Sequence, residues 1–454
     1  MKRTTTIGCT DPHAKRTAVT HDRAIYAERR RAFMSKMERG VAIFRAAPVS
    51  IRSHDVDYPY RQDNDLLYLT GFAEPEATCV LAPGTELPCT MFVRPRATDK
   101  EIWTGLRAGV DGAKNVYGAD AAYPIEELAE RLPKLIEHAP VLYFAPGRDT
   151  AFNQRMMDLF AWARDNRARS GAGPRGILDP GTILHEMRLF KGAEEIAAME
   201  RAIAIAAEGH TAAMMATRSG LFEYEIEALI DYTFRRRGAA GPAYPSIVAS
   251  GPNATILHYV ENNRRMDDGD LLLVDAGAEW GGYCADVTRT FPVGQRFSDR
   301  QRALYDVVLA SQEAAIAAVK PDVAVDAPHQ KALEVLVDGL LAHGLLEGTR
   351  DAAIESGSYR TFFMHRTSHW LGMDVHDVGV YHVGDGPRAL APGMVLTIEP
   401  GLYVPPNLDT VDAGWRGIGI RIEDDVLVTE DGGRVLSAAV PKTVAAIEAL
   451  RAGT

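Results

Sequence analysis

Two aspartates in one apolar stretch are the first residues whose spacing suggests chemistry. Asp275 and Asp286 lie in the segment 271–291, where two apolar runs flank Trp280-Gly281-Gly282. This pattern predicts a β-hairpin. A turn at 280–281 would pair the aspartates directly, whereas a turn at 281–282 would make them a diagonal pair on the same face. Because like charges facing each other destabilise a half-buried sheet, either register indicates a cation between them, most naturally a divalent metal.

Three histidines lie close together further along the chain. His365, His369 and His376 fall within twelve residues beside an apolar run. A single histidine in such a place is more often a satisfied, partly buried side chain than a ligand, but three together favour a site. His365 and His369 have the i, i+4 spacing of a helical metal pair. The glutamate of an HExxH motif is missing, however, which excludes a zincin of that type.

Two glutamates are placed at predicted strand ends. Glu399 follows the strand pattern 394–398 and precedes Pro-Gly, a position compatible with solvent or with a site. In the segment 417–423, alternation puts Gly419, Arg421 and Glu423 on one face. That face fits a solvated ion pair, but its glycine indicates the close approach of a ligand or of another backbone.

Together these segments predict a metal site with four carboxylates and one imidazole. Oxygen ligands with a single nitrogen suit Mn²⁺, Co²⁺ or Fe²⁺, and Zn²⁺ is also compatible. Five ligands, four of which can bridge or chelate, exceed the need of one ion. Two metals roughly 3.5–4 Å apart would neutralise the carboxylates and hold a shared hydroxide as nucleophile. The predicted ligands are Asp275, Asp286, His369, Glu399 and Glu423.

Length and composition limit the class of protein that carries this site. The chain has 454 residues, which suggests two domains, and its 24% charged and 46% hydrophobic residues are typical of a soluble globular protein. A net charge of −11 opposes binding to nucleic acid. No apolar run approaches the ~18 residues needed to cross a membrane.

Cysteine usage and the N-terminus indicate the compartment. Cys9, Cys79, Cys89 and Cys284 are scattered without a CxxC pair, which favours free thiols in a reducing compartment. Residues 1–23 are polar and lack the apolar core of a secretory signal, so we expect a flexible extension. The cytoplasm is therefore the expected location.

The first half of the chain predicts an α/β domain over residues 24–163. A helix composition over 24–40 precedes strand patterns, and a further helix is expected over 124–138. Charge, glycine and proline over 164–185 suit an exposed linker. The predicted strands are 41–44, 79–81, 91–93 and 141–144.

The remaining residues, 186–454, predict an α+β domain in which helices cover antiparallel strands. Helices are expected over 193–216, 223–237 and 299–319, the last with Ser298 as its N-cap. Strands are expected over 246–250, 394–398 and 418–422, in addition to the hairpin.

At these residues the chain resembles the aminopeptidase P (Xaa-Pro aminopeptidase) branch of the pita-bread metallopeptidases. The superfamily also includes prolidase, methionine aminopeptidase and metal-free creatinase. The resemblance covers roughly residues 25–450 and joins many motifs in order. These motifs are Tyr58-Pro-Tyr-Arg-Gln, Tyr68-Leu-Thr-Gly-Phe, Leu257-His-Tyr, the aspartate hairpin, His365-x-x-x-His369-Trp-Leu-Gly, Ile398-Glu-Pro-Gly and Arg421-Ile-Glu.

The resemblance implies a role for each matched residue. Asp286 and Glu423 would bridge two metals, Asp275 would complete one ion, and His369 with Glu399 the other, Glu399 also handling the proton of the bridging water. Further matched residues would contact substrate, stabilise the tetrahedral intermediate or lie near the site: His258, His365, His376, Arg421 and Tyr403. Members of this branch often carry a small residue directly after the first histidine, where this chain has Arg366, a difference that bears on the rim of the cleft.

The implied activity is hydrolysis of the first peptide bond in peptides with proline second, with two divalent ions, most naturally Mn²⁺, as cofactors. Prolidase, restricted to Xaa-Pro dipeptides, is one alternative, and a metal-free pita-bread binding module is another. The resemblance also implies a homodimer or homotetramer. Nucleic acid and membrane are not expected as partners.

Overall fold

The structure is a computed structural model that describes residues 23–147 and 149–453 of the chain. The chain divides into two compact units, residues 1–187 and 188–454. The predicted N-terminal extension lies outside the described residues except for Arg23, which begins the first helix. No helix among the described residues is long and apolar enough to cross a bilayer.

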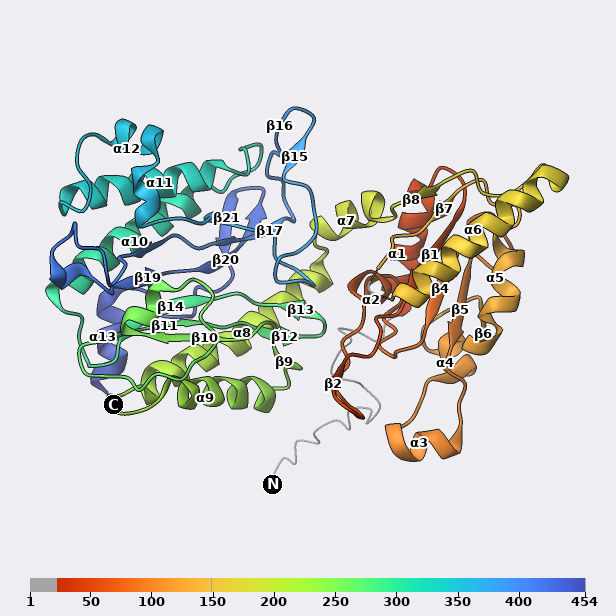
Figure 1. The fold of residues 1–454 in the computed structure, drawn as a ribbon, viewed down its shortest axis with the longest axis horizontal. Coiled ribbons are helices and arrows are strands. Elements are labelled where there is room, and N and C mark those ends of the chain that lie inside the picture. The colour runs from red at the N-terminus through yellow and green to blue at the C-terminus, as the bar shows by residue number, and fades with distance from the viewer. Residues whose placement is uncertain (1–22, 148, 454) are drawn as a thin grey trace, which may run out of the picture. The chain divides into compact units, whose positions relative to one another are not determined.

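The first unit is built on a mixed six-stranded sheet in the order β6-β5-β4-β1-β7-β8 (Figure 1). Strand β1 pairs antiparallel with β4 and parallel with β7. Its apolar core joins the sheet to α5 and α6 through Phe92, Leu132 and Met156. The strands are Val41–Arg45 (β1), Ile51–Ser53 (β2), Val56–Asp57 (β3), Thr78–Leu81 (β4), Cys89–Val93 (β5), Ala121–Pro124 (β6), Leu142–Tyr143 (β7) and Ile177–Leu178 (β8).

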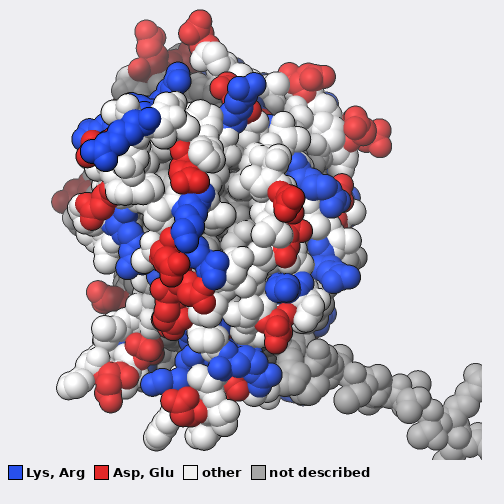
Figure 2. All heavy atoms as spheres, turned by 90° about the vertical axis from the view of Figure 1, so that its right-hand side faces the viewer, with Lys and Arg blue, Asp and Glu red and all other residues white. Residues whose placement is uncertain are grey.

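Helices and strands alternate in this unit, which confirms the predicted α/β class. The helices are Arg23–Lys36 (α1), Asn64–Thr70 (α2), Thr98–Thr104 (α3), Gly109–Asn115 (α4), Leu128–Ile136 (α5) and Thr150–Ser170 (α6). On the face shown in Figure 2, acidic and basic side chains are interspersed and do not form one continuous basic area.

The expected linker over 164–185 is wrong as a description of this segment. Helix α6 continues to Ser170, β8 adds to the sheet beside β7, and a further helix spans Gly181–Leu189 (α7). Asp149 caps α6 by accepting a hydrogen bond from the Phe152 amide. Charge and glycine therefore mark the exposed end of a helix and a turn rather than a free linker.

The second unit combines pairs of helices with antiparallel strands. Helix α8 packs on β12 and β13, and α9 packs on β9 and β10, while α10 and α11 pack on each other, and α10 covers β21 (Figure 1). The Ser298 hydroxyl accepts from the Gln301 amide, so the predicted N-cap of α10 is confirmed. The helices are Ala193–Ala216 (α8), Glu223–Arg236 (α9), Asp299–Ala318 (α10), Ala327–Ala342 (α11), Arg350–Ser356 (α12) and Val444–Ala452 (α13).

The strands of the second unit form several short antiparallel sheets. Strand β11 lies between β10 and β14, and β20 lies between β17 and β21. Leu396 and Ile398 of β17 join Trp370 in one buried apolar cluster. The bounds are Gly241–Pro242 (β9), Ile247–Ser250 (β10), Leu271–Asp275 (β11), Ala278–Trp280 (β12), Tyr283–Cys284 (β13), Thr288–Pro292 (β14), His382–Val383 (β15), Gly386–Pro387 (β16), Val395–Ile398 (β17), Gly401–Tyr403 (β18), Gly419–Arg421 (β19), Asp424–Thr429 (β20) and Gly432–Val435 (β21).

Candidate metal centre

The aspartate hairpin forms with its turn at Gly281-Gly282. Trp280 pairs with Tyr283, and Asp275 pairs with Thr288 in the same antiparallel register. Both glycines have positive φ, 62° and 82°, as a type I′ turn requires. This register makes Asp275 and Asp286 a diagonal pair, the second of the two predicted arrangements.

A tyrosine hydroxyl joins the two aspartates. Tyr244 Oη donates toward Asp275 Oδ1 at 2.6 Å and lies 2.5 Å from Asp286 Oδ1. Burial, followed by the charges of Asp275 and Asp286, raises the pKa of Tyr244 well above its usual value, so the hydroxyl stays protonated. The sequence did not point to Tyr244, because it lies more than thirty residues before Asp275 and only the folded chain brings it there.

Asp286, His369 and Glu423 come together as a possible metal-binding group. One ligand atom from each lies within 4.8 Å of those of the other two. His369 Nε2 is 3.3 Å from Asp286 Oδ2 and 3.6 Å from Glu399 Oε1. With Asp275 held beside Asp286 through Tyr244, all five predicted ligands are gathered in one place.

The imidazole of His369 is oriented by the backbone around it. Its Nδ1 lies 3.0 Å from the Trp370 carbonyl oxygen, which accepts a hydrogen bond when the proton is on Nδ1. Nε2 is then free to act as a ligand, as in most metal-binding histidines. Residues 362–381 contain no helix, so the i, i+4 spacing of His365 and His369 is not a helical one.

Short strands position the two glutamates. Glu399 directly follows β17, and its amide donates to the Thr367 carbonyl at 2.8 Å. Glu423 lies between β19 and β20, where the Thr288 hydroxyl donates to its Oε2 at 2.6 Å. Behind it, Arg289 donates to the Glu423 carbonyl at 2.6 Å and pairs with buried Asp424 at 2.7 Å.

The buried carboxylates of this cluster need a positive charge to compensate them. Burial, and then the charges of Asp286 and Glu399, raise the pKa of Glu423 well above its usual value. Burial likewise raises the pKa of Glu399, although His369 and Arg421 oppose it. Burial alone would lower the pKa of His369, but Asp286 and Glu399 outweigh it and raise it to about 9. The donor set therefore fits a divalent metal, which would replace protons as the compensating charge.

A second chain of contacts runs from the cluster to His365. Arg421 Nη2 donates to Asp275 Oδ2 at 2.7 Å, and its Nη1 donates to the Tyr403 hydroxyl at 3.1 Å. His365 Nε2 lies 2.9 Å from the same hydroxyl. Burial, followed by the charge of Arg421, lowers the pKa of His365 to about 4, so its imidazole is neutral near pH 7. Arg421 is buried, so the solvated ion pair considered for its strand face is wrong.

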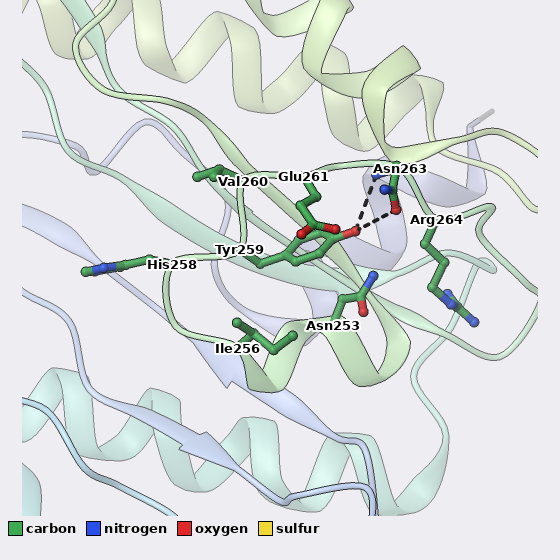
Figure 3. Close-up of a pocket in the computed structure, with 8 residues that line it drawn as sticks. All are labelled: Asn253, Ile256, His258, Tyr259, Val260, Glu261, Asn263 and Arg264. Carbon is green, nitrogen blue, oxygen red and sulfur yellow. Dashed lines mark hydrogen bonds between the residues drawn. The ribbon is translucent and has the colours of Figure 1, made fainter.

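His376 and His258 lie at the edge of the site. The rings of His369 and His376 are 4.4 Å apart between centroids. The charge of His258 contributes to lowering the pKa of both His365 and His376, after the larger effect of burial. His258 also borders an open cavity of about 570 Å³ together with Asn253, Ile256, Tyr259 and Arg264 (Figure 3).

Gly419 shows why the predicted strand carries a glycine beside Arg421. A Cβ there would lie 2.1 Å from the carbonyl oxygen of Ala254, which belongs to the short 3₁₀ turn Gly251–Thr255 (η2). The predicted close approach is therefore that of another backbone.

Comparison with known proteins agrees with this geometry. Residues 197–430 match metallopeptidase family M24, and residues 26–143 match the aminopeptidase P N-terminal domain. The chain therefore belongs to metallopeptidase family M24 and is a metallo-aminopeptidase with a pita-bread catalytic domain.

Individual relatives place it in the aminopeptidase P branch. The chain is 44% identical over 432 residues to the Xaa-Pro aminopeptidase of Escherichia coli, covering 94% of this chain and 97% of the relative. The aminopeptidase PepP structure from Pseudomonas aeruginosa is 49% identical with a TM-score of 0.93, over 95% of this chain and 98% of that one. Proline aminopeptidase P II from Yersinia pestis is 44% identical with a TM-score of 0.91, over 95% and 100% of the chains.

Proposed function

We propose that the chain is an Xaa-Pro aminopeptidase that removes the first residue from peptides with proline second. The observation that carries the proposal is the Asp286, His369 and Glu423 cluster in a chain that is 44% identical to an Xaa-Pro aminopeptidase. A tertiary Xaa-Pro amide lacks an N–H, and its ring fixes the backbone, so general peptidases fit it poorly.

The site would hold two divalent ions, with Mn²⁺ the first choice and Co²⁺ or Zn²⁺ as alternatives. Asp286 and Glu423 would bridge them, Asp275 would complete one ion, and His369 with Glu399 the other. A related structure is described as Zn-substituted Escherichia coli aminopeptidase P in complex with product, which supports a metal at this site. When bound, the metals supply Lewis acidity to the scissile carbonyl and lower the pKa of water.

The chain's own residues would carry the proton and the developing charge. A carboxylate oxygen of Glu399 would take the proton of the attacking water, a role that its raised pKa supports. His365 is neutral near pH 7, its Nδ1–H donates to the Arg366 carbonyl, and its Nε2 accepts from the Tyr403 hydroxyl, so it would hold that hydroxyl in place beside the developing charge. His258 and His376 would contact substrate at the edge of the site.

Arg421 has a positioning role in this scheme. Its guanidinium is buried and donates to both Asp275 and Tyr403. It therefore orients one metal ligand and the hydroxyl beside His365 at the same time. A bidentate cation of this kind fixes both groups with little remaining freedom.

A short peptide series tests the proposal. Metal-stripped protein would be assayed with Mn²⁺, Co²⁺ and Zn²⁺ separately, on Xaa-Pro-Yaa tripeptides, Xaa-Pro dipeptides and Xaa-Ala-Yaa controls. We expect metal-dependent cleavage of the tripeptide before proline and little cleavage of the alanine control. Strong preference for the dipeptide would assign a prolidase instead, and cleavage without regard to position two would contradict proline specificity.

We also propose a homo-oligomer, a dimer or tetramer, located in the cytoplasm. Two large apolar side chains of α3 are notably exposed, Trp103 at 86% and Ile102 at 77%, and exposed apolar groups of this kind often mark protein contacts. Cys79, Cys89 and Cys284 are buried free thiols, which supports a reducing compartment. Light scattering of the purified protein measures the oligomer, and a monomer would contradict that part.

A further inference from the structure

In the segment that carries His258, apolar packing is limited to its two chain neighbours, Leu257 and Tyr259, which join a small buried cluster. Residues 256–264 form no helix or strand, and most of their side chains are exposed. Tyr259 and Asn262 are the buried exceptions. Such a segment therefore depends on specific polar contacts in addition to this limited packing.

Asn262 bonds to the backbone of Ser246 and Val248, but most of the other polar contacts converge on Glu223, the first residue of α9, whose side chain is fully buried. Its Oε1 accepts from the Ser250 amide at 2.6 Å, the Ser250 hydroxyl at 2.7 Å and Asn253 Nδ2 at 3.2 Å. Its Oε2 accepts from the Tyr259 hydroxyl at 2.8 Å and the Arg264 amide at 2.9 Å. One carboxylate therefore binds Ser250 and Asn253 before His258, and Tyr259 and Arg264 after it; residues 250–264 are called segment 250–264 below.

The Glu223 contacts bracket His258 on both sides. Asn253 precedes it, next to the point where Ala254 lies against Gly419, and Tyr259 directly follows it. In Figure 3, His258 points away from the side on which Asn253 and Asn263 lie. The side chains that bond to Glu223 and the His258 imidazole therefore extend to opposite sides of the backbone. A shift of the backbone at the Glu223 contacts would move the imidazole as well.

We propose that Glu223 is a positioning residue for catalysis, which acts by fixing segment 250–264 and through it the imidazole of His258. Tyr259 transmits the effect, since it bonds to Glu223 and is adjacent to His258 in the chain. Glu223 and Tyr259 do not themselves touch substrate in this scheme. The inference rests on the proposed function, in which His258 contacts the peptide.

The test begins with Tyr259→Phe, which keeps the ring but removes the hydrogen bond to Glu223 and the longer contact with the Asn263 amide. We expect kcat/KM for an Xaa-Pro-Yaa tripeptide to fall on the order of 10-fold, the lower limit of the usual loss when a contact that orients a site residue is removed. The amount of bound metal should not change. Tyr305→Phe is the matched control, because its buried hydroxyl donates to the Lys442 carbonyl at 2.7 Å outside this segment. That control should keep wild-type kcat/KM.

A double-mutant cycle with His258→Ala separates positioning from general loss of structure. In the His258→Ala background, Tyr259→Phe and Glu223→Gln should lower kcat/KM almost no further, because the imidazole that they position is absent. Glu223→Gln is used rather than alanine because it keeps the volume and an acceptor oxygen. Full additivity of either variant with His258→Ala would overturn the inference.

Amide hydrogen exchange provides a readout that needs no substrate. Amides of residues 256–264 should exchange faster in Tyr259→Phe and Glu223→Gln than in wild type or Tyr305→Phe. Unchanged exchange there would overturn the inference. If the wild type does not cleave Xaa-Pro peptides, the proposed function fails by itself, and the exchange result alone then decides whether Glu223 orders the segment.

Discussion

The metal ligands and the surrounding histidines are held by different kinds of structure. Asp275 ends a strand, Asp286 lies within the hairpin, and Glu423 lies between two strands, so backbone ladders locate their carboxylates. His258 and His365 lie on segments without helix or strand, where side-chain hydrogen bonds locate them. Asp275, Asp286 and Glu423, called the strand-held region below, therefore keep their charges in fixed positions. The positions of His258 and His365 depend instead on a few individual hydrogen bonds.

The largest expected effect comes from breaking the strand-held region. Asp286→Ala should abolish metal binding and turnover together, because the carboxylate contacts both the His369 and the Tyr244 side of the cluster. Metal content by mass spectrometry and tripeptide hydrolysis measure the two effects. Asp374→Ala, at a half-exposed aspartate outside the ligand set, should retain both. Full activity in Asp286→Ala would contradict the assignment.

The next largest effect is a loss of stability on removing Asp377 from a buried cluster of charged side chains. Asp377 adjoins His376 and accepts from Arg188 at 2.7 Å and Lys191 at 3.0 Å, with all three side chains almost fully buried. Asp377→Ala leaves those cations without this carboxylate and should lower the free energy of unfolding by about 3–5 kcal/mol. Asp374→Ala, which removes the more exposed partner of Arg188, should cost less than about 1 kcal/mol.

Urea unfolding of both variants measures this difference, with the slope of the transition checked for each. Equal destabilisation by Asp377→Ala and Asp374→Ala would show that the buried cluster does not hold the His376 segment. Such a result would weaken the distinction between the two regions.

A smaller effect is expected from His365→Ala, which tests whether a residue outside the strand-held region affects turnover without affecting metal binding. We expect kcat/KM to fall on the order of 100-fold, because the Tyr403 hydroxyl beside the developing charge loses the group that orients it. Metal content should stay at the wild-type level, because His365 is 3.9 Å from Glu399 and is not among the predicted ligands. Loss of metal in this variant would instead show that His365 helps to hold the metal, as the strand-held residues do.

The pH dependence of the metal-stripped protein gives the smallest effect. The raised pKa of His369, about 9, contributes stability that is fully present below its ordinary value near 6.5 and lost as pH rises through about 9. The raised pKa of Glu399 has the same sign, with stability lost as pH rises above the usual glutamate range. The lowered pKa of His365 has the opposite sign, but its contribution is complete above about pH 7, so stripped protein should unfold a few degrees lower at about pH 9 than at about pH 7.

Added Mn²⁺ should reverse this trend, because it competes with protons for the same side chains. The increase in unfolding temperature caused by Mn²⁺ should be larger at about pH 9 than at about pH 7. A metal effect that shrinks as pH rises would contradict the proton and metal competition.

The sequence predicts the strand-held region well for a physical reason. Period-two alternation and a Gly-Gly turn restrict where Asp275 and Asp286 point, and both alternatives place them on one face. Helices α8, α9 and α10 follow from apolar periodicity and a capping serine in the same way. Such local patterns need no knowledge of distant parts of the chain.

Contacts made only by tertiary folding could not be predicted. Tyr244 and Glu223 lie far along the chain from the residues they bind, and nothing in their local sequence marks them. The segment 164–185 shows the opposite failure, because its charge and glycine resemble a linker although much of it is helix and strand. Composition reports exposure there, not the absence of structure.

The most direct test of the account is a Mn²⁺ titration of the metal-stripped chain, with bound metal and Xaa-Pro-Yaa hydrolysis measured on the same samples. We expect two Mn²⁺ per chain, with cleavage before proline appearing as the ions bind. Hydrolysis that is complete in stripped protein, or the absence of any bound metal at saturating Mn²⁺, would contradict it.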